Sequence, residues 1–118
     1  MHNKPAFLRF CKTMELRNDE QLILAYKKAH AAGAAWPEIT LGMKEVGIID
    51  MEIYLLGTTL FMIMDTVPDF DHAEAMAALA VKPRQSEWEM YMSRFQNGSA
   101  KHDANAKRQL MERIYKME

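Results

Sequence analysis

The chain has 118 residues, 49% of them hydrophobic, and its 15 Lys and Arg against 16 Asp and Glu give a formal net charge of −1. This length suits one domain over residues 1–118 whose core needs no disulfide or metal, and the charge excludes broad attraction to nucleic acid or anionic lipid. The lone Cys11 excludes an internal disulfide, and the longest apolar stretch, 60–64, is too short to span a bilayer. We therefore expect a cytoplasmic protein that contacts neither nucleic acid nor a membrane.

The first third of the chain predicts a strand and two helices. Residues 7–16 fit a strand, residues 20–32 a helix capped by Asn18 and Asp19, and residues 37–46 a second helix that ends at Gly47. Tyr26 and His30 lie four residues apart in the first of these helices, so both side chains fall on one face.

A β-hairpin is predicted next, with strands at 48–55 and 60–66 joined around Gly57 and Thr58. The first strand alternates with period two. One side carries Asp50, Glu52 and Tyr54, and the other carries Ile49, Met51, Ile53 and Leu55. We expect this polar strand face and the helix of Tyr26 and His30 to enclose a polar pocket.

The remaining segments predict two more helices and a last strand. Asp69 can cap a helix that runs through Leu79, and a helix after Pro83 places Trp88, Tyr91, Met92 and Phe95 on one side. Residues 97–99 stop that helix, residues 99–106 form a polar loop, and residues 109–115 alternate as a strand.

This order of elements predicts an α+β fold, the ferredoxin-like split βαβ plait, with a four-stranded antiparallel sheet and helices on one face. The second face carries apolar residues such as Phe61 that water alone would leave as a sizeable patch. We therefore predict a homodimer that packs sheet against sheet, the dimeric α+β barrel.

The candidate site residues also have simpler interpretations. Taken alone, His30 is more simply a capping or solvated histidine, Tyr26 a half-buried aromatic, and Trp88 a core residue as readily as a sugar platform. Asp50 and Glu52 can be solvated strand carboxylates, and Glu89 an ordinary surface charge. We interpret His2, His72 and His102 as surface residues.

Ordered motifs along nearly the whole chain resemble the rhamnose mutarotase family, and most closely its L-fucose mutarotase-like branch. They are Tyr26 with His30, the sequence Trp-Pro-Glu-Ile at 36–39, and Gly-Ile-Ile-Asp-Met-Glu-Ile-Tyr at 47–54 followed by Leu56 and Gly57. Further matches are the sequence at 60–65, Trp88 and Glu89 with Met92, Phe95 and Gln96, and Met-Glu-Arg-Ile at 111–114.

The resemblance implies a dimeric ferredoxin-like plait that interconverts the α and β anomers of a 6-deoxy-hexose. The histidine matched by His30 donates a proton, the tyrosine matched by Tyr26 orients the sugar, and Met51, Trp88 and Glu89 line the site, with Trp36 assigned beside them. Met51 and Glu89 replace a tyrosine and a tryptophan of the rhamnose enzymes, which argues against a rhamnose preference.

Mutarotation moves only protons, so we expect neither a metal nor a cofactor. An unperturbed histidine pKa of about 6.5 suits His30 as general acid and base. Glu52 or Glu89 is its candidate partner at the C1 hydroxyl, and the predicted catalytic set is His30, Tyr26 and Glu52.

Three alternatives stay open. The chain could be an L-rhamnose mutarotase, or a non-catalytic dimeric sugar-binding module that lost proton transfer through the segment 31–35, about two residues longer than the family resemblance implies. It could also be a plait-type monooxygenase acting on a hydrophobic substrate, because one fold hosts many activities.

Overall fold

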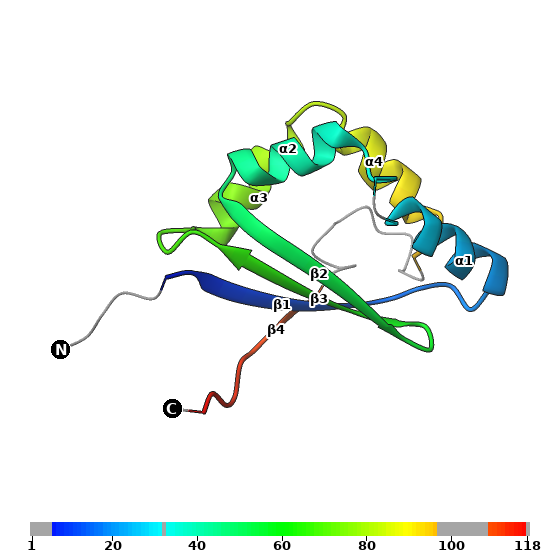
Figure 1. The fold of residues 1–118 in the computed structure, drawn as a ribbon, viewed down its shortest axis with the longest axis horizontal. Coiled ribbons are helices and arrows are strands. Elements are labelled where there is room, and N and C mark those ends of the chain that lie inside the picture. Colours follow the sequence, from blue (N-terminus) through cyan, green and yellow to red (C-terminus); the bar gives the residue numbers. More distant parts are fainter. Residues whose placement is uncertain (1–5, 32, 97–108, 118) are drawn as a thin grey trace.

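The computed structural model describes residues 6–31, 33–96 and 109–117, which form one antiparallel sheet with helices on one of its faces (Figure 1). The elements in chain order are β1 (Leu8–Glu15), α1 (Glu20–Ala29), α2 (Pro37–Glu45), β2 (Ile48–Leu56), β3 (Thr59–Thr66), α3 (His72–Ala80), α4 (Gln85–Ser93) and β4 (Gln109–Met111). The sheet order is β2-β3-β1-β4. This confirms the predicted α+β plait. Two of its four helices lie between β1 and β2, and the other two lie between β3 and β4.

Strands β1 and β3 form the centre of the sheet, paired without interruption from Leu8 opposite Thr66 to Glu15 opposite Thr59. Alternate residues of β3, from Leu60 to Thr66, are buried, and they face the helices. We call this the helix face of the sheet, and the opposite side, which carries Phe61 and Ile63, the outer face.

The turn into β2 depends on Gly47, as the sequence predicted. Its φ is +105°, and a Cβ there would lie 3.0 Å from the Val67 side chain, so only glycine fits both the backbone and the space. A register shift between Ile48 and Asp50 then leaves Ile49 exposed. The prediction that Ile49 lies on the same side of the strand as Met51 was therefore wrong, because a β-bulge breaks the alternation at that point.

Two helix ends differ from the prediction. Asp19 caps α1 as expected, accepting hydrogen bonds from the N–H groups of Gln21 and Leu22, but α1 ends at Ala29 with His30 as its C-cap, short of the predicted Ala32. The cap of α3 is Asp71 rather than Asp69. The N–H of Phe70 bonds to the carbonyl of Val67, and this turn buries Phe70 and delays the helix by two residues.

The last strand is shorter than predicted. β4 pairs only residues 109–111 with residues 11–13 of β1. Ile114 and Tyr115 are exposed, so no buried contact holds residues 112–115 in register. The predicted stop at 97–99, the loop at 99–106, His2 and His102 lie outside the described residues.

The helices bury two groups of side chains against the helix face. The larger joins β1, α1 and α4, where Trp88, Met92 and Phe95 are buried, three of the four residues predicted to share one side of the last helix. The smaller surrounds Ile48, Met64 and Phe70. None of the helices described is long and apolar enough to cross a membrane.

Candidate active site

A cavity of about 100 Å³ lies between the helix face of the sheet and all four helices. Its walls are mostly apolar. The polar side chains among them come from β1, α1, α2 and α4: Lys12, Tyr26, His30, Thr40, Gln85 and Glu89. A largely apolar cavity with a few convergent polar groups is the usual form of a small-molecule site.

The pair Tyr26 and His30 lies at the C-terminal end of α1. The ring centroids are 4.2 Å apart, and Nδ1 of His30 lies 2.9 Å from the carbonyl oxygen of Tyr26. A carbonyl oxygen only accepts, so Nδ1 carries the hydrogen in this contact and fixes the tautomer. Nε2 is then the ring nitrogen suited to exchange a proton.

Trp88 of α4 is buried and lines the cavity beside this pair, with its ring edge-to-face against His30 at 5.5 Å between centroids. Trp36, which the sequence assigned to substrate binding, is not among the lining residues. It packs behind Trp88 at 5.1 Å, stacks on Tyr91 at 5.8 Å, and carries the guanidinium of Arg84 at 4.0 Å. That assignment is corrected, because the indole supports the wall of the cavity without forming it.

One turn of α4 supplies two further polar groups. Nε2 of Gln85 donates a hydrogen bond to Oε1 of Glu89 over 3.0 Å, and both side chains line the cavity. Glu89 is the only carboxylate among the described lining residues. The contact holds that carboxylate in a fixed position next to Trp88.

Lys12 is a further polar group of the cavity that was not predicted as a site residue. It lies on the helix face of β1 with 7% of its surface exposed, and its Nζ donates to the sulfur of Met76 over 3.8 Å. A signal was present, since Lys12 falls between Phe10 and Met14 at the inward positions of an alternating strand. Lysine is almost never fully buried unless its ammonium group is paired, so a lysine at such a position is a signal worth following.

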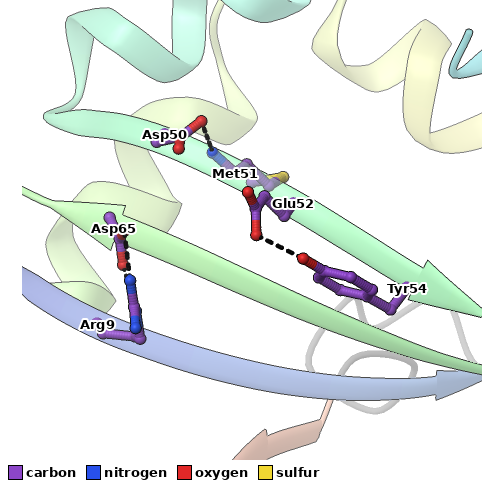
Figure 2. Close-up of polar contacts among 6 residues, drawn as sticks. All are labelled: Arg9, Asp50, Met51, Glu52, Tyr54 and Asp65. Carbon is purple, nitrogen blue, oxygen red and sulfur yellow. Dashed lines mark hydrogen bonds and ion pairs between the residues drawn. The ribbon is translucent and has the colours of Figure 1, made fainter.

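The prediction that the polar residues of β2 line the cavity is wrong. Met51 and Ile53 line the cavity, so the alternating Asp50, Glu52 and Tyr54 lie on the outer face. Figure 2 shows the contacts that these three make with near neighbours: the phenol of Tyr54 donates to Glu52 over 2.9 Å, and Asp50 accepts from the N–H of Met51. Bonding to Glu52 raises the pKa of Tyr54. Glu52 therefore cannot be the partner of His30 within one chain.

His72 also differs from its prediction as a surface residue. It is half-buried, with its ring 5.3 Å from Phe10 and 6.5 Å from Phe70, and among the described residues nothing bonds to its buried Nε2. Burial, followed by the charge of Lys12, lowers the pKa of His72, while Asp71 opposes them. Within the described part of the chain, no three His, Cys, Asp or Glu side chains are grouped so that they could hold a metal ion.

Comparison with known proteins agrees with this geometry. A model of the L-rhamnose mutarotase family matches residues 9–117. An L-fucose mutarotase of Xanthomonas campestris pv. campestris is 36% identical over 88 residues, which cover 75% of this chain and 70% of the relative. A UPF0734 protein of Dictyostelium discoideum is 35% identical over 88 residues, 74% of this chain and 69% of the relative.

The fold has a solved counterpart. The crystal structure of an L-rhamnose mutarotase from Formosa agariphila superposes with a TM-score of 0.67 at 21% identity, covering 94% of this chain and 99% of that one. A plait that encloses a histidine and a tyrosine beneath its helices, together with these relatives, defines a sugar mutarotase, an isomerase that acts on monosaccharides. The chain belongs to the L-rhamnose mutarotase family.

Proposed function

We propose that this mutarotase interconverts the α and β anomers of a 6-deoxy-hexose, L-fucose in the first place, with His30 as the general acid and base and Tyr26 orienting the sugar. The observation that carries the proposal is the cavity itself. It brings together His30 with a fixed tautomer, a tyrosine, and a single described carboxylate, that of Glu89. We assign to Glu89 the role of the base at the C1 hydroxyl, for which the sequence left Glu52 and Glu89 as candidates.

Ring opening moves two protons and breaks one bond, and ring closure reverses both changes. Glu89 accepts the proton of the C1 hydroxyl while Nε2 of protonated His30 gives a proton to the ring oxygen, and the bond from C1 to the ring oxygen breaks to leave an aldehyde. Rotation about the bond from C1 to C2 presents the other face of the aldehyde. The two protons then return in reverse, and the ring closes as the other anomer.

The substrate preference rests on the relatives and on Met51. The X. campestris relative carries the name L-fucose mutarotase and is 36% identical, whereas the family model carries the name of L-rhamnose. Met51 and Trp88 give the cavity apolar surface that fits the methyl group of a 6-deoxy sugar. L-rhamnose is the second candidate because of the family name.

NMR exchange spectroscopy between the α and β C1 protons of L-fucose, L-rhamnose and D-glucose tests the proposal. The protein should accelerate exchange for one 6-deoxy sugar, and His30→Ala should lower that acceleration by about 100-fold or more. His72→Gln is the matched control, because His72 does not line the cavity. Undiminished exchange in the His30 variant would reject its role, and wild-type binding without exchange would favour the non-catalytic binding module.

We also propose that residues 1–118 form one domain that assembles as a homodimer in the cytoplasm, through the outer face. Phe61, Ile63 and Cys11 keep part of their apolar surface exposed on this face, and Tyr54 of β2 pairs with Phe61 of β3 beside them. Light scattering on the wild type and on Ile63→Asp tests the assembly. A dimeric wild type and a folded monomeric variant would support it, and a monomeric wild type would reject it.

A further inference from the structure

Arg84 lies just before α4 and has a left-handed backbone, with φ of 63° and ψ of 5°. Among the described residues other than glycine, it alone has a positive φ. An arginine in this conformation is strained, and the strain persists only where surrounding contacts impose it. Such residues are often found at functional sites. The reason for the conformation therefore lies in the contacts of Arg84.

The side chain of Arg84 joins the beginnings of two helices. Its guanidinium lies over the indole of Trp36, the residue just before α2, at 4.0 Å from the ring centroid. It also forms ion pairs of 3.5 Å with Glu38 in the first turn of α2 and with Glu87 in the first turn of α4. We call these contacts the Arg84 clamp.

The Arg84 clamp borders the part of α4 that lines the cavity. The N–H of Trp88 bonds to the carbonyl of Arg84 over 3.0 Å, and the indole of Trp36 packs on Trp88 at 5.1 Å between centroids. Trp88 in turn packs against His30, and Glu89 follows it in the chain. A shift at the start of α4 would therefore move the proposed base relative to the proposed acid. A misplacement of about 1 Å can slow a reaction by about 100-fold.

The ion pairs of the clamp do not explain its presence by stability. The side chains of Arg84 and Glu38 are 41% and 39% exposed, and that of Glu87 is 62% exposed, so these pairs contribute little to the stability of the fold. A planar guanidinium that stacks on an indole while it pairs with carboxylates restricts the relative position of all these groups. The clamp is thus better suited to fixing a position than to stabilising the chain.

We propose that Arg84 is a positioning residue of the reaction, which holds the start of α4 against Trp36 and α2 so that Glu89 and Trp88 lie correctly relative to His30. Arg84 is not among the residues that line the cavity, so it acts through Trp36 and Trp88 without touching the sugar. The inference rests on the proposed function of the same cavity.

Arg84→Gly tests the clamp, because glycine adopts a positive φ without strain and only the side chain is lost. NMR exchange spectroscopy over a range of sugar concentrations measures kcat and KM, and urea denaturation gives the folded fraction to which kcat is referred. The variant should lose about 10-fold in kcat and keep KM within about twofold, since misplacement affects proton transfer more than binding. A purely structural residue would change the folded fraction and leave kcat per folded molecule unaltered.

Arg94→Ala is the matched control, because it removes an exposed arginine that lies 5.0 Å from the ring centroid of Tyr91 at the other end of α4. Its kcat should stay within about twofold of the wild type. Arg84→Lys keeps the charge without the planar group, should also lose kcat, and repeats the test if the glycine variant does not fold.

An unchanged kcat in the Arg84 variants, or an equal loss in Arg94→Ala, would overturn the inference. If the wild type accelerates anomer exchange while the Arg84 variants keep its kcat, only this inference fails. If the wild type accelerates exchange for neither L-fucose nor L-rhamnose, the proposed function fails with it.

Discussion

The two faces of the sheet both carry polar side chains, but those on the outer face are exposed and bonded to one another, whereas those on the helix face are buried. On the outer face, Arg9 forms a bidentate ion pair with Asp65, and Tyr54 bonds to Glu52, all beside water (Figure 2). On the helix face, Lys12 is buried among apolar residues. Exposed polar groups that satisfy one another leave little for a ligand, whereas buried polar groups in an apolar cavity mark the site.

The largest expected difference between the two faces is in the loss of stability when a side chain is truncated. Met64 on the helix face has 2% of its surface exposed, whereas Leu56 at the hairpin has 85% exposed. Met64→Ala should lower the free energy of unfolding by about 2–5 kcal/mol, because it removes buried contacts and leaves a void. Leu56→Ala should change it by about 0.5 kcal/mol or less. Urea denaturation measures both, and equal losses would contradict the assignment of the faces.

The rate of anomer exchange should likewise depend on one carboxylate of the helix face and not on one of the outer face. Glu89→Gln should slow anomer exchange by about 100-fold, because an amide cannot take the proton of the C1 hydroxyl. Glu52→Gln changes the same group on the outer face and should leave the rate within about twofold, since it removes no group from the cavity. NMR exchange rates at saturating sugar compare the variants. A slow Glu52 variant together with a normal Glu89 variant would reverse the assignment.

The pH dependence of stability should show the buried position of His72. Its pKa is lowered below the ordinary value of 6.5 in the folded chain, so the unfolded chain binds the proton first as pH falls. Stability present above pH 6.5 is therefore lost as pH drops through the lowered value. His72→Leu should lose less stability than the wild type between about pH 7 and about pH 5. Parallel curves would show that His72 is not buried in its neutral form.

The smallest effect belongs to the outer-face ion pair. The hydrogen bond and charge of Arg9 lower the pKa of Asp65 below 3.8, so its contribution is present above that pH and lost as pH falls through the lowered value. Asp65→Asn should lower the thermal midpoint slightly at neutral pH, because exposed pairs contribute little. The difference between wild type and variant should vanish in strong acid, and thermal melts at both pH values measure it.

Much of the fold could be predicted because local signals agreed with the tertiary structure. Asp19 as a cap, Gly47 as a stop and the turn at Gly57 each follow from the local backbone conformation, and the space beside Val67 adds to the requirement for glycine at position 47. The predictions that were wrong needed contacts from afar. The late start of α3 depends on the burial of Phe70, and the early end of the last strand on the absence of contacts for Ile114.

In the candidate site, too, the errors concern features that depend on distant parts of the chain. Tyr26, His30, Met51, Trp88 and Glu89 all line the cavity, and the roles that the family resemblance implied for them stay predictions. The error at Glu52 arose because period-two alternation separates the faces of a strand but does not say which one the helices will cover. Lys12 and Gln85 were missed, since their significance comes from burial by other elements.

The placement of the two indoles has a spectroscopic consequence. The chain contains two tryptophans, and Trp88 touches both the cavity and the imidazole of His30 while Trp36 packs against Trp88. The tryptophan fluorescence of the protein therefore comes entirely from the neighbourhood of the cavity. Occupancy of the cavity and ionisation of His30 should both alter that emission, so the wild-type protein needs no added dye to report either event.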